Sequence, residues 1–540
     1  MAGLATTFGS GAMTNSINEI EEAEVILATG SNTTEAHPQI ARRMLAAVDK
    51  GAKLLVIDPR RTRLAELADV HLQIRPGTDI PILNGMMRII LDESLADQLF
   101  IEMRTENFAA LQEMLNKIDL AEVERTTGVP LAEIRKAAIL YARARRAVIC
   151  YCLGITQHVA GTKNVQSIAN LAMLTGNVEK EFTGVDPLRG QNNVQGACDM
   201  GALPNVYPGY QKVDDPAARE KFAKVWGTEL DPAPGVTLLD MTHSGANGVM
   251  KGMLIMGENP FLSDPLVDKV EETLANLEFL AVSDIFLTET AQFAHVVFPA
   301  ASFAEKGGTF TNTERRVQMV RPAIDPINDC RTDSEIISEL ATRMGYPMAY
   351  ESSTEIMEEI SLLTPIYGGI IHQRLGGDKW GLQWPCWDQN HPGTPYLHKQ
   401  YFTRGKGNFI PGEHTPPVES PCEDFPFFLN TGRVYHHYHT GTMTRKSEAL
   451  NRESKEALLQ IHPDDAKRLE IRDGDTLCVA SRRGAVQLPA QITHAVAPGS
   501  VYTSFHFSET PVNRLTIDTQ DPIAKCPEYK VCAVRIEKAP

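Results

Sequence analysis

The sequence predicts an α/β protein in which two blocks of parallel sheet are followed by a β-rich module. In the first third of the chain, apolar runs alternate with helical patterns, which is the rhythm of β-α-β units in a doubly wound sheet. The same alternation returns around residues 253–298. After Phe425 the pattern changes to short apolar runs separated by turns, which is typical of a β-barrel.

The first block contains four short strands and two clear helices. A polar loop follows the first strand, and Pro76-Gly77-Thr78 leads into a further helix that we expect Asp79 to cap. The expected elements are a strand from Ala23 that ends at Gly30, a helix with apolar positions 40, 44, 45 and 48, strands at 54–57 and 70–74, a helix over 131–146 and a strand over 147–153.

The rest of the chain divides into the second block, a connector and the β-rich module. Residues 365–425 are rich in Gly, Pro and Trp and predict an irregular connector. The strands expected in the second block are 253–256, 279–282 and 295–298, and those of the module are 458–461, 476–480, 487–492 and 501–505, with a turn at 473–475.

Composition limits the classes of function. The chain has 540 residues, enough for three or four domains, and its charge sum of 52 − 68 = −16 argues against nucleic acid as the main partner. No apolar run reaches the roughly 20 residues of a membrane span. The nine cysteines are an odd number without a Cys-x-x-Cys spacing. We therefore expect reduced thiols, and no iron–sulfur or structural zinc site held by this chain alone.

Four loops at strand ends or helix starts suggest a cradle for a nucleotide-type cofactor. They are 30–37, 58–60, 76–79 and 257–259. Ligands of open α/β sheets bind at the carboxyl ends of strands, backbone N–H groups at helix starts accept phosphate, and aspartates accept from ribose hydroxyls or a guanine edge. Ordinary turns and caps are the alternative interpretation. Gly9-Ser-Gly11 follows no strand, so an NAD fingerprint is not supported.

Two further polar runs stand out. Arg189-Gly-Gln-Asn-Asn-Val-Gln-Gly196 places a planar cation beside several amides, which suits a two-pronged grip on a small carboxylate or on the heteroatom edge of a cofactor. A solvated loop is the alternative. His436, His437 and His439 lie close together without a carboxylate at a useful spacing, so a metal site there is the less favoured interpretation.

The run from Arg189 to Pro204 resembles the signature of the catalytic alpha subunit of molybdenum- or tungsten-dependent formate dehydrogenases. The resemblance covers the whole chain and includes 11–17, 170–177, 336–347, 382–386 and 527–530. It implies two Rossmann-like parallel-sheet domains and a C-terminal double-psi β-barrel. The implied domains are 1–190, the first pterin-dinucleotide half; 191–400, the second α/β domain with the connector; and 401–540, the barrel.

The resemblance also implies the cofactor and the residues of its site. The cofactor is a bis(molybdopterin guanine dinucleotide) with Mo or W, and Arg189 matches the arginine that faces metal and formate. Glu35 stands where a close relative has Asp, so its reach differs. The implied cofactor-binding residues are Asn32, Glu35, His37, Asp58, Arg60, Gly77, Asp79, Gln157, Gln191, Gly257, Asn259, Asp284, Thr288, Thr431, Arg433, His437, Asn513, Tyr529 and Lys530.

The resemblance implies an oxidoreductase that converts formate to CO2 or runs the reverse reaction, with electron-transfer subunits as partners and a cytoplasmic location. The family begins with a [4Fe-4S] domain and a selenocysteine or cysteine metal ligand, and neither is found here. We therefore expect the chain to be a fragment that is inactive as given. We expect Met1 to stand for a Val codon downstream of an in-frame UGA. Another pterin-metal oxidoreductase, such as a nitrate reductase, and an inactive scaffold remnant are the alternatives.

Overall fold

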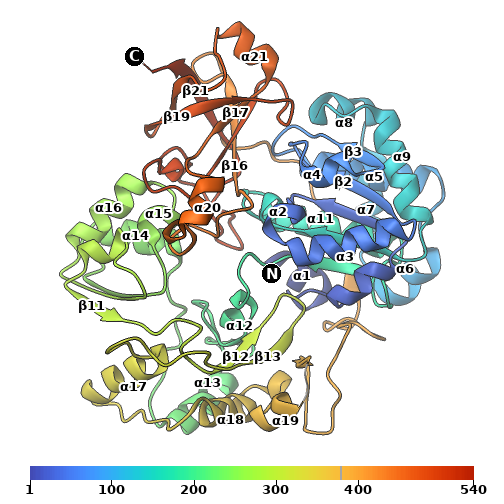
Figure 1. The fold of residues 1–540 in the computed structure, drawn as a ribbon. Helices are drawn as coiled ribbons and strands as arrows, with labels where there is room; N and C mark the ends of the chain where they lie inside the picture. Colours follow the sequence, from blue (N-terminus) through green and yellow to red (C-terminus); the bar gives the residue numbers. More distant parts are fainter. Residues whose placement is uncertain (378–379, 540) are drawn as a thin grey trace. The chain divides into compact units, whose positions relative to one another are not determined.

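A computed structural model describes residues 1–377 and 380–539 of the chain, and it contains the parallel sheets and the closed barrel that the sequence predicts (Figure 1). The described chain divides into two compact units. Unit 1 comprises Met1–Gly190, Leu262–Val267 and Tyr396–Pro540, and unit 2 comprises Gln191–Phe261 and Asp268–Pro395. The division into three domains at 190 and 400 stays a prediction.

The centre of unit 1 is a five-stranded, fully parallel sheet in the order β3-β2-β1-β5-β6. Alternate residues of β1 enter different cores, because successive side chains of a strand point to opposite faces. Leu27 packs with α5, α9 and α11 on one face, and Ile26 packs with α3 and α4 on the other (Figure 1). The elements are β1 Val25–Thr29, α3 Pro38–Asp49, β2 Lys53–Ile57, α4 Arg63–Glu66, β3 Val70–Leu72, α5 Asp79–Asp92, α9 Leu131–Arg143, β5 Ala147–Tyr151, α11 Gly161–Leu174 and β6 Gly184–Pro187.

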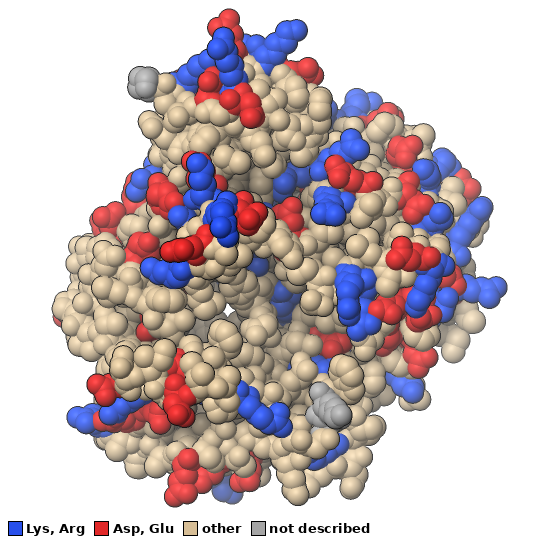
Figure 2. Space-filling model, viewed as in Figure 1, with Lys and Arg blue, Asp and Glu red and all other residues tan. Residues whose placement is uncertain are grey.

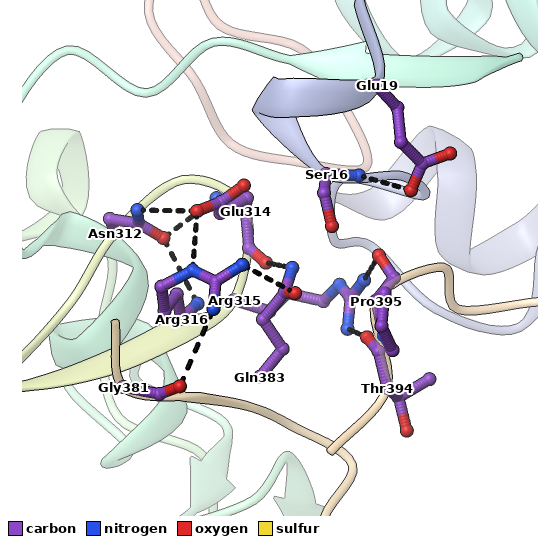
Figure 3. Close-up of polar contacts among 10 residues, drawn as sticks. All are labelled: Ser16, Glu19, Asn312, Glu314, Arg315, Arg316, Gly381, Gln383, Thr394 and Pro395. Atoms are coloured by element: carbon purple, nitrogen blue, oxygen red, sulfur yellow. Dashed lines mark hydrogen bonds and ion pairs between the residues drawn. The ribbon is translucent and has the colours of Figure 1, made fainter. Parts of the chain in front are cut away.

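Shorter elements complete the α/β part of unit 1. The 3-10 helix η1 begins with a capping box in which Ser16 N donates to Glu19 Oε1 at 3.3 Å (Figure 3). The prediction that Asp79 caps α5 is wrong: Thr78 is the N-cap residue, and Asp79 is the first residue of the helix. The remaining elements are α1 Ala2–Phe8, η1 Ile17–Glu22, α2 Thr33–Ala36, α6 Gln98–Arg104, β4 Thr105–Glu106, α7 Phe108–Asn116, α8 Leu120–Thr127 and α10 Leu153–Thr156.

The C-terminal part of unit 1 is a closed six-stranded barrel in the order β16-β20-β17-β19-β18-β21. The sequence predicts four of these strands and misses β16 and β21. These are the first and the last strand of the barrel along the chain, and they pair with each other. The elements are β15 Gly407–Asn408, β16 Phe427–Gly432, η4 Thr444–Lys446, α20 Glu448–Glu453, β17 Leu459–Ile461, α21 Pro463–Arg468, β18 Thr476–Ala480, β19 Ala485–Ile492, β20 Ser500–Ser504, η5 Val512–Arg514 and β21 Cys532–Lys538.

Unit 2 contains a parallel sheet in the order β11-β10-β9 and an antiparallel sheet in the order β12-β13-β14. The parallel strands lie where the sequence predicts them. The elements are α12 Val194–Asp199, β7 Val206–Tyr207, β8 Gln211–Lys212, α13 Pro216–Trp226, α14 Leu238–Ala246, β9 Gly252–Met256, α15 Pro260–Ser263, α16 Val267–Asn276, β10 Phe279–Asp284, η2 Thr290–Phe293, β11 Val296–Pro299, β12 Gly308–Thr311, β13 Arg316–Val320, α17 Asp333–Arg343, α18 Ser353–Leu363, η3 Pro365–Tyr367, α19 His372–Gly377 and β14 Leu382–Gln383.

A buried arginine ties the connector to the antiparallel sheet of unit 2. Arg315 is fully buried at the turn before β13 and has a φ of 67°. Its guanidinium donates to the backbone carbonyls of Thr394 at 2.8 Å and Pro395 at 3.1 Å (Figure 3). It also donates to the Trp384 carbonyl. The connector therefore contains little regular structure, as predicted, but the side chain of Arg315 holds its backbone in place through three carbonyl groups.

The surface carries both signs of charge. Figure 2 shows Lys and Arg interspersed with Asp and Glu on the face in view, so the net negative charge is not gathered in one patch there. Within the part of the chain that the structure describes, none of the helices has the length and apolar character that crossing a membrane requires.

Candidate functional site

A cavity in unit 1 opens where the strand order of the sheet reverses, between the carboxyl ends of β1 and β5. Crevices at such reversals are the usual ligand sites of open α/β sheets. Gly30 follows β1, and Gly154 lies just after β5 and donates its N–H to the Gly30 carbonyl at 3.0 Å. A Cβ atom on Gly30 would lie 2.7 Å from the carbonyl carbon of Gly154, and one on Gly154 would lie 2.6 Å from the Gly30 oxygen. The crossing of these two loops therefore requires glycine on both sides.

The barrel supplies the other wall of the cavity. The lining residues come from the ends of β16 and β20, from the segment before β21, and from the loops after β1, β2, β3 and β5. The predicted site residues that line it are Asn32, His37, Asp58, Arg60, Gly77, Asp79, Thr431, Arg433 and Lys530.

Arg60 is held so that part of its guanidinium stays available to a ligand. Its carbon lies 3.4 Å from the centre of the Tyr502 ring, and its Nη2 donates to Gln460 Oε1 at 3.2 Å. Its Nε is buried and has no hydrogen-bond partner in residues 1–377 and 380–539. Because a buried unpaired donor is costly, this atom fits an anionic ligand such as a phosphate.

His37 offers the opposite kind of atom. Its Nε2 lies 2.6 Å from the Arg189 carbonyl oxygen, which can only accept, so Nε2 carries the proton and Nδ1 is an acceptor. Nδ1 is also buried without a partner among the described residues. Burial lowers the pKa of His37, which keeps the ring neutral. A ligand that offers a hydrogen-bond donor to His37 Nδ1 and an acceptor to Arg60 Nε would give both atoms the partner that they lack.

Three ionisable groups of the cavity have shifted pKa values. Burial raises the pKa of Asp58 to about 6, although its hydrogen bond from Arg60 N at 2.8 Å and the charge of Arg60 oppose the shift. Burial also raises the pKa of Asp79. Burial and then the charge of Arg433 lower the pKa of Lys530 to about 8, and its Nζ donates to the Thr431 carbonyl at 2.8 Å. Perturbed groups gathered in one cavity are typical of a functional site.

The sequence interpretation missed several lining residues, among them Cys152, Gly154, His158 and Tyr502. The strand predicted at 147–153 runs two residues past the end of β5 and therefore hid Cys152. Gly154 directly follows that predicted strand, so the rule that selected the other loops applies to it. Tyr502 and His158 carry no such signal, because their positions depend on how the barrel meets the sheet.

Other predicted residues of unit 1 contribute through the backbone or pack elsewhere. Glu35 lies in α2. Burial raises its pKa, and the charge of Arg60 acts in the opposite direction. The carbonyls of Gln157 and Tyr529 accept from Lys530 N at 3.4 Å and Thr431 Oγ1 at 2.7 Å, respectively. Asn513 Nδ2 donates to the Leu262 carbonyl at 2.8 Å.

His437 has both ring nitrogens engaged within the protein. Its Nε2 lies 2.6 Å from the Ser454 carbonyl oxygen, and its Nδ1 lies 3.2 Å from Thr444 Oγ1. Within residues 1–377 and 380–539, no group of three His, Cys, Asp or Glu side chains is placed to hold a metal ion.

The predicted residues of unit 2 gather at the carboxyl ends of β9 and β10. Gly257 donates its N–H to the Ser283 carbonyl at 2.8 Å, with a φ of 61°. Asn259 is held by Glu289 Oε2 at 2.8 Å and by Thr290 Oγ1 at 2.7 Å. Burial raises the pKa of Asp284, and Thr288 Oγ1 accepts from Ala291 N at 3.2 Å. Gln191 is the first residue of unit 2.

The run from Arg189 to Pro204 is divided between the two units, since the first segment of unit 1 ends at Gly190 and unit 2 begins at Gln191. Its second half anchors α12 through Asp199, a carboxylate that the sequence interpretation left without a role. Asp199 is fully buried and accepts four side-chain hydrogen bonds, from Tyr367 at 2.6 Å, Trp384 at 2.7 Å, Tyr210 at 2.7 Å and Gln195 at 2.8 Å. A buried carboxylate with this many donors holds its neighbours in fixed positions. Arg189 itself donates from Nη2 to the Gly11 carbonyl at 3.4 Å.

Comparisons with known proteins agree with this architecture. A family model described as molybdopterin oxidoreductase matches residues 3–343, and one described as molydopterin dinucleotide binding domain matches residues 427–533. The F420-dependent formate dehydrogenase subunit alpha of Methanocaldococcus jannaschii is 50% identical over 543 residues, covering 100% of this chain and 80% of that protein. The assimilatory nitrate reductase catalytic subunit of Bacillus subtilis is 35% identical, covering 98% and 76%. The solved structure of acetylene hydratase from Pelobacter acetylenicus superposes with a TM-score of 0.77 at 19% identity, covering 100% and 80%, which establishes the fold alone.

Proposed function

Because the chain belongs to the molybdopterin oxidoreductase family, we propose that it is the catalytic subunit of a molybdenum- or tungsten-dependent formate dehydrogenase. The observation that carries the proposal is the identity of 50% to a formate dehydrogenase alpha subunit, against 35% to a nitrate reductase. The alpha-subunit name of that relative also supports partner subunits that carry electrons. A cytoplasmic location stays a proposal.

The cavity of unit 1 fits one half of a pterin dinucleotide cofactor. Arg60, Arg433 and Lys530 would hold its phosphates, and the buried Arg60 Nε and His37 Nδ1 would gain the partners that they lack in the protein. Asp58 and Asp79 would accept from hydroxyl or N–H groups of the nucleoside. When bound, the cofactor supplies the metal centre that takes up two electrons.

The residues at the ends of β9 and β10 would hold the second dinucleotide. Asp284 and the backbone at Gly257 are the groups suited to contact it. Asn259 is already bonded to Glu289 and Thr290, so we assign it the role of shaping the loop rather than of binding through its side chain.

Arg189 would bind and orient formate. A guanidinium is charged at all working pH values and presents parallel N–H groups that match a carboxylate. When Arg189 binds the carboxylate group of formate, the C–H bond at the other end of the molecule can point toward the reacting centre. Arg189→Lys keeps the charge but loses the planar fork, so we expect kcat/KM for formate to fall by about 2–4 kcal/mol in barrier terms. The exposed Arg42→Lys is the matched control.

The proposal is tested on the native enzyme complex isolated from its source. Formate oxidation with an artificial dye, together with about two guanine nucleotides released per chain on acid hydrolysis, would support it. Nitrate reduction without formate oxidation would favour the nitrate reductase alternative. A chain that carries no guanine nucleotide would leave only the scaffold alternative.

A further inference from the structure

One wall of the unit 1 cavity is carried by a small closed loop, residues 519–530, which we call the strap. Its two sides are joined by hydrogen bonds from Asp521 N to the Cys526 carbonyl at 2.9 Å and from Glu528 N to the Thr519 carbonyl at 3.0 Å. Its tip, residues 522–525, is exposed. The strap ends at Lys530, whose side chain lines the cavity, so the position of the strap decides whether that ammonium faces a ligand.

Two buried carboxylates fasten the strap to the start of α11. Asp521 is 1% exposed and accepts from both Thr162 N and Thr162 Oγ1 at 2.8 Å. Glu528 is 2% exposed; its Oε1 accepts from Val159 N at 3.2 Å and lies 3.6 Å from His158 Nδ1. Its Oε2 is buried and has no partner among the residues that the structure describes. Glu528 thus needs a positive charge beside it more than Asp521 does.

His158 is placed to supply that charge. Its Nε2 lies 2.9 Å from the Gly154 carbonyl oxygen, which only accepts, so Nε2 carries a proton. Its Nδ1 then faces Glu528, and an unprotonated Nδ1 would set a lone pair against a carboxylate. Burial by itself lowers the pKa of His158, but the nearby carboxylate of Glu528 and the charge of Asp79 outweigh it and raise that pKa. Asp79 at the start of α5 and Glu528 on the strap are the acidic groups that face the ring.

We propose that His158 and Glu528 form a buried ion pair that positions the strap, and through it Lys530, against the ligand in the cavity. Glu528 lies two residues before Lys530, and Lys530 N donates to the carbonyl of Gln157, the neighbour of His158. If the pair is broken, one of the two carboxylate fastenings of the strap is weakened. Lys530 is then held at the cavity wall only by its own bonds, among them those to the Thr431 and Gln157 carbonyls. The ligand meant here is the phosphate-bearing dinucleotide, so this part of the inference rests on the proposed function.

The test uses the native protein with its cofactor and compares Glu528→Gln with Glu537→Gln, an exposed glutamate on β21. Removing one partner of a buried pair is costly, and we expect Glu528→Gln to speed both trypsin cleavage after Lys525, in the exposed tip, and release of guanine nucleotide by about tenfold or more. In the parent protein, release should quicken as the pH rises through the pKa of His158, because the ring loses its charge. In Glu528→Gln the contribution of His158 to this pH dependence should be lost, and only that of Lys530, whose pKa is about 8, should remain.

A second measurement uses the parent protein alone, so that it decides the question even if Glu528→Gln does not fold. In protein labelled with ¹⁵N-histidine, His158 should show the spectrum of a ring with both nitrogens protonated at neutral pH. A neutral ring, or cleavage and release rates of Glu528→Gln equal to those of Glu537→Gln, would overturn the ion pair. If the protein carries no guanine nucleotide, the proposed function fails instead, and the cleavage rate and the ¹⁵N spectrum still decide the pairing.

Discussion

Asp58 should make the ligand-free protein less stable as the pH rises, and Asp58→Asn should remove this effect. Burial raises the pKa of the folded-state carboxyl to about 6 from its ordinary value of 3.8. A raised folded-state pKa means that the protonated form stabilises the fold at low pH and that this stability is lost as the pH rises through about 6. At about 1.4 kcal/mol per pKa unit, the full loss is about 3 kcal/mol.

The pH dependence is a sharper readout than the size of the effect. Linkage predicts that Asp58→Asn gains about 1.6 kcal/mol over the parent near pH 5 and about 3 kcal/mol near pH 7.5. Asn keeps an oxygen that accepts from Arg60 N, so that hydrogen bond, 2.8 Å long, is retained. Urea midpoints of the ligand-free proteins at both pH values measure the difference.

The exposed Asp49→Asn, at the end of α3, removes the same charge without the burial. Its effect should be nearly the same at both pH values. A gain for Asp58→Asn that is flat or shrinks with rising pH would refute the assignment of a desolvated carboxyl at the cavity.

Three further outcomes follow from contacts and charges inside each unit. Gly154→Ala should cost about 1–3 kcal/mol of stability, because its Cβ would lie 2.6 Å from the Gly30 oxygen; urea unfolding checks this against Gly376→Ala, where no described atom lies within 4 Å of the added carbon. Asp199→Asn should cost about 1–3 kcal/mol, since an amide cannot accept all four donors, and an unchanged melting temperature would contradict the anchoring role. Pyrophosphate affinity of the ligand-free protein should fall as the pH passes about 8, because Lys530 loses its proton there; titration calorimetry at several pH values would reveal a flat profile if another group binds the anion.

The sequence by itself determined the elements whose patterns are local. The strands of the two parallel sheets other than β6 are short runs rich in apolar residues, whereas β6, with the sequence Gly-Val-Asp-Pro, was missed. The structure buries β1 on both faces because its alternate residues enter separate cores. Four barrel strands were found in the same way. The loops after these strands could be chosen as site candidates, since parallel strands bring their carboxyl ends to one edge.

The tertiary structure alone decided which of these loops contact one another and which strands close the barrel beside them. The barrel strands β16 and β21 were missed although both begin with apolar residues, and only the structure shows that they pair with each other and with distant strands to close the barrel. Gly154 has its role only because the loop after β5 crosses the loop after β1.

Two buried carboxylates that the sequence interpretation left without a role, Asp199 and Glu528, show the same limit. Asp199 belongs to the Arg189 run, yet its donors Tyr367 and Trp384 lie 168 and 185 residues away in the sequence. The partners His158 and Glu528 are likewise distant along the chain and meet where the strap lies against α11. The sequence contains the charges, but their burial and pairing, which set their pKa values and their cost, exist only in the folded chain because both depend on the distance between groups and on the exclusion of water.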